Sequence, residues 1–102
     1  MSVINKFKEV LYDEGFTKKE LIDQDEFEIY YNDYSDYICY ITFYPDLKSF
    51  TFMLKDMRNN ICISRMYDEF ELTLFSIDLQ KFLYETLHEQ RDMLMDYLKK
   101  GE

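Results

Sequence analysis

The residues best suited to chemistry in this 102-residue chain are one histidine and a dense set of carboxylates. The segment His88 to Asp92, HEQRD, begins like the zinc-binding pattern H-E-x-x-H but has aspartate where the second histidine ligand is needed. The segment Asp23 to Asp25 begins like a calcium loop, but Glu28 stands at the glycine position and Tyr34 at that of the bidentate glutamate. The motifs therefore predict neither a zinc nor a calcium site.

The sequence also lacks other catalytic motifs. Glycine occurs only at positions 15 and 101, so the sequence contains neither a phosphate-binding loop nor a dinucleotide fingerprint. With 21 acids in the chain, close carboxylate pairs arise by chance and do not indicate acid–base catalysis. Cys39 and Cys62 fit no metal spacing and are expected in the core or on a sheet face. We expect a protein that is not an enzyme and has no metal and no cofactor.

Negative charge is the strongest chemical signal. The formal net charge is −9, which opposes direct contact with nucleic acid or anionic lipid and favours a basic protein surface as partner. The stretch from Glu20 to Leu47 holds eight carboxylates and six tyrosines without a lysine or arginine. Acids interleaved with amphipathic rings are typical of a surface that a partner protein binds.

The hydrophobic pattern predicts one α+β domain over residues 1–102. Ser2 is expected to cap a first helix that Gly15 ends. Strands are expected at 26–31, 37–44, 49–54 and 61–66 because apolar residues alternate with polar ones or fill both faces. Residues 69–75 fit a fifth strand or an early helical turn, and residues 16–25 fit a loop or a short strand.

A last helix is expected to run from Ser76, its N-cap, to about Lys100, with Asp78 in the first turn. Short connections predict an antiparallel meander of four or five strands, with the N-terminal and C-terminal helices on one face, in the order α-β-β-β-β-(β)-α. No apolar run reaches the ~20 residues of a membrane span, and the N-terminus lacks a signal-peptide pattern. We therefore expect no membrane contact and a cytoplasmic location, in a bacterial host cell because the composition suits GC-poor codons.

Five carboxylates of the last helix fall within a sector of about 60°, nearly opposite its leucines. Like charges four residues apart cost roughly 0.2 to 0.5 kcal/mol per pair, which a face selected only for stability would avoid. An ordinary solvated helix face is the alternative. The charges recur about every 5.4 Å against about 1.7 Å in duplex DNA, so nucleic-acid mimicry would need the acids of 23–28 and 68–71 on the same side. This acidic spine consists of Asp78, Glu85, Glu89, Asp92 and Asp96.

The sheet face away from the helices is the second candidate surface. If Phe27 and Ile29 point into the core, Glu26, Glu28 and Tyr30 point outward. Tyrosine and methionine are enriched at interface centres, so this face fits a recognition surface, a homodimer contact or a second packed layer. Further outward positions are expected at Tyr40 or Tyr37, Met53, Met66, Glu69 and Glu71.

In size, acidity and α+β type the chain resembles phage-encoded inhibitors of host defence nucleases, the anti-CRISPR and anti-restriction proteins. The resemblance covers composition and transfers no residues. It implies a protein that binds and inhibits a basic, nucleic-acid-binding protein such as a host nuclease. Alternatives are an immunity protein or antitoxin for a basic nuclease toxin, and a homodimeric accessory phage protein. The expected partner-binding residues are Asp23, Asp25, Glu26, Glu28, Tyr30, Tyr40, Asp78, Glu85, Glu89, Asp92 and Asp96.

Overall fold

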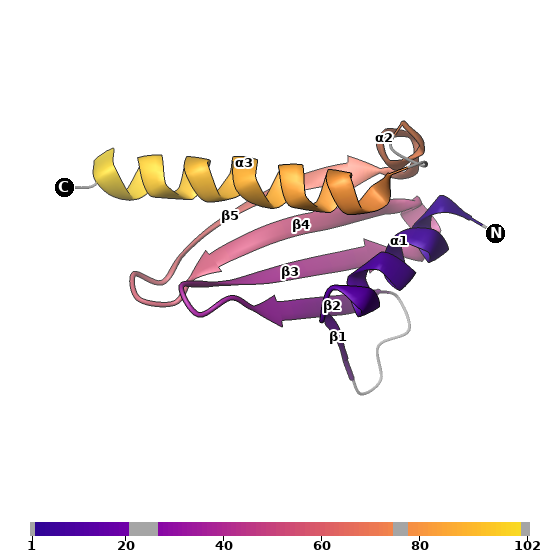
Figure 1. The fold of residues 1–102 in the computed structure, drawn as a ribbon, viewed down its shortest axis with the longest axis horizontal. Coiled ribbons are helices and arrows are strands. Elements are labelled where there is room, and N and C mark those ends of the chain that lie inside the picture. Colours follow the sequence, from indigo (N-terminus) through magenta and orange to yellow (C-terminus); the bar gives the residue numbers. More distant parts are fainter. Residues whose placement is uncertain (1, 21–26, 75–77, 101–102) are drawn as a thin grey trace.

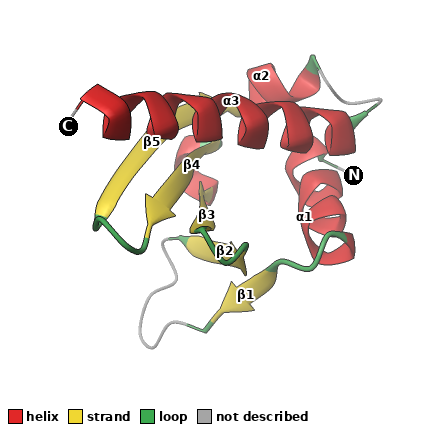
Figure 2. Cartoon of the chain, turned by 60° about the vertical axis from the view of Figure 1, so that its left-hand side comes forward, coloured by secondary structure: helices red, strands yellow, loops and turns green. Residues whose placement is uncertain are grey.

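The computed structural model describes residues 2–20, 27–74 and 78–100 (Figure 1). Five antiparallel strands form one open sheet in the order β1-β2-β3-β4-β5, which confirms the predicted meander and the α+β class. The two long helices cover the same face of this twisted sheet (Figure 2). The elements are α1 (Val3–Asp13), β1 (Thr17–Lys19), β2 (Glu28–Asp33), β3 (Tyr37–Tyr44), the 3-10 helix η1 (Pro45–Leu47), β4 (Ser49–Asp56), β5 (Ile61–Asp68), α2 (Glu69–Thr73) and α3 (Leu79–Lys100).

Helix α1 begins and ends as the sequence predicts. The side chain of Ser2 accepts a hydrogen bond of 3.2 Å from the backbone N–H of Asn5, which satisfies one of the first amides of the helix. Gly15 follows the helix with a φ of +97°, a conformation that side chains with a Cβ rarely adopt. Phe7 and Leu11, four residues apart, are the buried residues of α1 and fix its orientation on the sheet.

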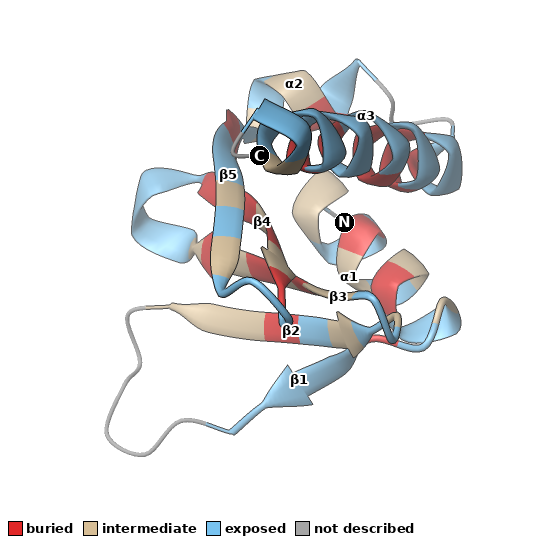
Figure 3. Cartoon of the chain, turned by 90° about the vertical axis from the view of Figure 1, so that its left-hand side faces the viewer, coloured by how far each residue is buried: buried red, intermediate tan, exposed pale blue. Residues whose placement is uncertain are grey.

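The core lies between the helices and the inner face of the sheet (Figure 3). In the β3–β4 register, Ile41 pairs with Phe52 and Phe43 with Phe50, and all four side chains are buried. Rings from four elements meet there. The ring of Phe50 lies 5.7 Å from Phe7 of α1, 5.6 Å from Phe43 and 6.3 Å from Phe82 of α3.

The predicted orientation of β2 is wrong. Tyr30 was expected on the outer face, but it is buried, and Ile29 takes the outer face. The reason is the pairing with β3, which sets Tyr30 opposite the core residue Ile41. The Tyr30 ring then meets the Phe43 ring edge-on at 5.6 Å. Glu28 shares this inner face, at the margin of the sheet, where lysines compensate its charge.

Residues 69–73 form helix α2, so the strand alternative for this segment is wrong. Asp68 accepts a hydrogen bond of 2.8 Å from the backbone N–H of Glu71 and thereby caps the helix. Leu72 is fully buried, whereas Phe70 and Leu74 are 70% and 69% exposed. The fifth strand is instead β1, at the opposite edge of the sheet.

Helix α3 begins at Leu79, and its first turn is capped by Asp78. The carboxylate of Asp78 accepts a hydrogen bond of 2.9 Å from the backbone N–H of Lys81. Asp78 was expected inside the first turn behind a Ser76 cap; Ser76 lies outside the described residues. The predicted leucine stripe does face the core, and it fixes which side of α3 points to solvent.

The α2 assignment predicts unequal effects at two neighbouring positions. Leu72→Ala should lower the free energy of unfolding by about 2 to 5 kcal/mol because it leaves a cavity in the core. Phe70→Ala should stay within about 0.5 kcal/mol of the wild type because that ring is exposed. Urea denaturation followed by circular dichroism measures both. Equal losses would mean that the two side chains share one buried strand face, contrary to the helix.

Candidate protein-binding surface

The outward side of α3 carries four of the five spine acids in exposed positions: Glu85, Glu89, Asp92 and Asp96. Their contacts with Lys81 and His88 are weak. Lys81 lies 3.9 Å from Glu85, and the His88 imidazole lies 3.5 Å from Asp92, both at well-exposed positions. Exposed pairs of this kind contribute roughly 0 to 1 kcal/mol and leave the charge available to a partner.

The C-terminal half of α3 also exposes large apolar side chains. Met93, Met95 and Tyr97 are between 50% and 58% exposed, and they are interleaved with Asp92 and Asp96. Methionine and tyrosine are favoured at the centres of protein interfaces. The combination of acids with large amphipathic side chains, expected along residues 20–47, therefore also occurs on this helix. Sequence reasoning missed these three residues because it scored the helix for charge alone.

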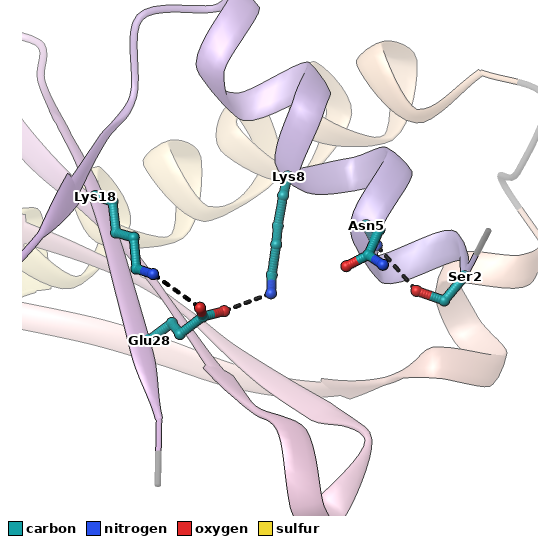
Figure 4. A network of polar contacts seen from close by, with 5 residues as sticks. All are labelled: Ser2, Asn5, Lys8, Lys18 and Glu28. Carbon is teal, nitrogen blue, oxygen red and sulfur yellow. Dashed lines mark hydrogen bonds and ion pairs between the residues drawn. The ribbon is translucent and has the colours of Figure 1, made fainter. Parts of the chain in front are cut away.

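Glu28 is held by two lysines from separate elements (Figure 4). Lys8 of α1 donates a hydrogen bond to one carboxylate oxygen, and Lys18 of β1 donates to the other at 2.9 Å. The hydrogen bond from Lys8 is the main cause that lowers the pKa of Glu28 below its usual range; partial burial opposes it, and Lys18 adds to the lowering. Glu28 thus ties α1 and β1 to β2, and its charge is already compensated.

The remaining predicted residues do not join the spine. Tyr30 is buried in the core, and Asp23, Asp25 and Glu26 lie outside the described residues. Tyr40 does lie on the open face of the sheet, where its ring is 6.3 Å from that of Tyr31. That face is opposite the helices, so the structure separates the tyrosine surface from the α3 surface (Figure 3).

The open face carries large side chains on several strands. Across the register, Tyr31 pairs with Tyr40, Tyr40 with Met53 and Met53 with Ser64, while Met66 of β5 pairs with Thr51. Both α1 and α3 lie on the other side of the sheet, so neither covers these side chains. Cys62 is exposed on this same face, which agrees with its expected position on a sheet face.

A cavity lies between α3 and the loops at one end of the sheet. It measures about 310 Å³, and Arg91 lies over the Tyr37 ring at 6.0 Å. The carboxylate of Asp56, on its wall, accepts hydrogen bonds from the backbone N–H and side chain of Asn59 and from the N–H of Arg58. These bonds lower the pKa of Asp56 and commit it to the β4–β5 turn. Residues 2–20, 27–74 and 78–100 hold no cluster of three metal-ligating side chains.

The chain matches no protein-family model, no curated protein and no solved structure. In the segments that the structure describes, each helix is too short or too polar to cross a bilayer. Two exposed surfaces stand out among the described residues, the acidic side of α3 and the tyrosine-rich open face of the sheet.

The Glu28 contacts predict a pH-dependent contribution to stability. A carboxyl whose pKa is lowered by folding stabilises the fold above its unfolded pKa of about 4.3 and loses that effect as the pH falls through the folded pKa. Glu28→Gln should therefore cost about 1 kcal/mol at pH 7, reduced by partial exposure, and almost nothing near pH 2. Urea denaturation at both pH values, with Glu9→Gln on exposed α1 surface as control, measures this. A cost that does not change with pH would contradict the ion-pair account.

Proposed function

We propose that this protein is a non-enzymatic inhibitor that binds a basic, nucleic-acid-binding protein through the outward side of α3. The observation that carries the proposal is the exposure of Glu85, Glu89, Asp92 and Asp96 on one side of a 22-residue helix. Grooves that bind nucleic acid hold clustered lysine and arginine, and complementary charge speeds association with such surfaces. A chain of net charge −9 is steered toward them rather than toward nucleic acid itself.

The apolar side chains of α3 would supply the residence time of the complex. Charge at the rim of an interface mainly sets the association rate, whereas buried aromatic and methionine side chains slow dissociation. Met93 and Tyr97 are exposed on the β5 side of the acids and fit the second role, whereas Met95 lies on the other side of the helix. In this proposal the acids select a basic partner, and Met93 and Tyr97 anchor it.

Inhibition follows from competition for the same cations. A protein seated on the lysines and arginines that contact phosphates prevents nucleic acid from reaching them. This mode fits the resemblance to anti-CRISPR and anti-restriction proteins, and we propose that the protein acts in the cytoplasm of a bacterial host. Glu28 is already paired with Lys8 and Lys18, so it adds little free charge to the spine. We therefore propose charge steering rather than a copy of the phosphate spacing.

Two variants of equal net charge test the surface. The spine variant carries Glu85→Lys, Glu89→Lys, Asp92→Lys and Asp96→Lys. The control carries Glu9→Lys, Asp13→Lys, Asp36→Lys and Asp46→Lys, at exposed positions outside α3. Each replacement of a carboxylate by lysine raises the net charge by two, so both variants have a net charge of −1 instead of −9.

Immobilised wild type, spine variant and control are incubated with lysate of a low-GC bacterial host, and bound proteins are identified by mass spectrometry. We expect a basic nucleic-acid-binding protein to be enriched on the wild type and the control, and at least tenfold less on the spine variant. The purified partner should lose nucleic-acid binding when an equimolar amount of the wild-type protein is added. Equal loss on the control and spine variants would show that net charge alone matters. Unchanged capture by the spine variant would contradict the assignment to α3.

A second candidate function is a homodimer through the open sheet face, favoured by the uncovered Tyr31 and Tyr40 rings beside Met53 and Met66. Light scattering after size-exclusion chromatography measures the mass in solution. The homodimer predicts twice the 12.6 kDa chain mass, reduced to one chain by Tyr40→Ser. A monomeric wild type, or a dimer unaffected by Tyr40→Ser, would exclude this interface. Substitution of Tyr30 would not serve, because that residue is in the core.

A further inference from the structure

The two edges of the sheet differ in how they are protected. β1 is three residues long and contains two lysines, Lys18 and Lys19, which are features that deter another strand from pairing. β5 is eight residues long, contains no proline, and is the terminal strand on the opposite side. Within the described chain, no further strand pairs with β5, so its outer row of backbone donors and acceptors is open to a partner strand.

The two charges of β5 are already used within the fold. Arg65 lies 3.6 Å from Glu71 and over the ring of Tyr67 at 4.7 Å. The carboxylate of Asp68 caps α2 through the backbone N–H of Glu71. Both side chains thus make contacts within the fold, and the other six residues of this eight-residue strand are uncharged.

A groove of about 150 Å³ runs between β5 and α3, lined by Arg65 and Tyr67 on one side and by Glu89, Gln90 and Met93 on the other. Gln90 is only 4% exposed, and neither its side-chain oxygen nor its nitrogen has a hydrogen-bond partner among the described residues. An unpaired buried amide costs roughly 1 to 3 kcal/mol. The wall of this groove thus holds a donor group and an acceptor that the described part of the chain leaves unpaired.

Large side chains above the groove are also left uncovered. At 100° per residue, Met93 and Tyr97 lie within about 60° of Gln90, on the side of α3 that faces the sheet. Leu94 on this part of α3 is buried, but Met93 and Tyr97 are 55% and 58% exposed. A chain segment placed along β5 would cover Met93 and Tyr97, which lie on the side of α3 that faces the sheet but are exposed.

The acidic spine borders the same groove. Glu89, a spine residue, lines it together with Met93, so the spine side of α3 is the side that overlooks β5. A second copy of this chain, paired antiparallel through β5, would bring its own spine against this one, and like charges facing each other are destabilising. A basic segment would instead find the complementary charge of Glu89 and the spine, while Arg65, which also lines the groove, lies 3.6 Å from Glu71. The occupant that fits is therefore a basic strand of another protein.

We propose that β5 pairs edge to edge with an extended, lysine- or arginine-containing segment of the basic partner, adding a sixth strand to the sheet. This inference rests on the proposed function and names how the partner is held. Alternate side chains of the added strand would face α3, where basic groups meet Glu89 and a polar group meets Gln90. The intervening side chains would lie beside Cys62, Ser64 and Met66 on the open face and would be apolar or carry a hydroxyl.

The test uses two capped hexapeptides of alternating lysine and valine, one ordinary and one N-methylated at every residue, titrated into ¹⁵N-labelled protein. The methylated peptide keeps its charge but has no backbone donor. We expect the ordinary peptide to shift the backbone amides of residues 61–68 and the side-chain amide of Gln90, and the methylated peptide to bind at least tenfold more weakly. A peptide in which glutamate replaces lysine should not bind.

The same titration on Glu85→Lys/Asp92→Lys/Asp96→Lys separates this inference from the proposed function. Equal binding of both lysine peptides, with shifts confined to α3 and lost in the triple variant, would overturn strand pairing and leave the charge-based function standing. Binding that the triple variant does not weaken would count against both. If the backbone amide signals of residues 61–68 do not shift at millimolar peptide, strand pairing is overturned. Strand pairing with a partner is also overturned if these signals shift when the protein alone is diluted, because that would identify a second copy as the occupant.

Discussion

The structure depends on one cluster of four phenylalanine rings. Phe7, Phe43, Phe50 and Phe82 come from α1, β3, β4 and α3, and five of their ring contacts lie between 5.6 and 6.3 Å. Each such contact adds about 0.5 to 1.5 kcal/mol to the burial of the rings themselves. Because one cluster joins both long helices to the central strands, the two helices must lie on the same face of the sheet.

This one-sided arrangement decides which surfaces remain for function. The inner face of the sheet is buried in the core, whereas the outer face, the β5 edge and the outward side of α3 are exposed. Of these, α3 and β5 border one groove through Glu89, Gln90 and Arg65. Charge, exposed methionine and unused hydrogen-bonding groups thus meet on one side of the molecule. The tyrosine-rich face, which Tyr31 and Tyr40 share, points the other way.

Sequence patterns predicted α1, the strands β2 to β5, the meander and the exposed acids of α3, because those depend on local periodicity and short connections; they left β1 and α2 open. The orientation of β2 was not predictable from alternation, since Glu28 appears as a solvent residue until Lys8 and Lys18 are seen to hold it. The Asp68 cap distinguishes α2 from a strand, and that signal was present in the sequence. Whether the Gln90 amide has a hydrogen-bond partner depends on contacts between distant elements, and the periodicity of the sequence cannot predict those contacts.

The central claim is that the acidic side of α3 and the open edge of β5 form one binding surface for a basic protein. Hydrogen–deuterium exchange of the complex with the captured partner, compared with the protein alone, tests it most directly. The account predicts slowed exchange of the backbone amides in 61–68 together with the exposed half of α3, and unchanged exchange in β2 and β3. Protection confined to β2 and β3, the strands that carry Tyr31 and Tyr40, would contradict it.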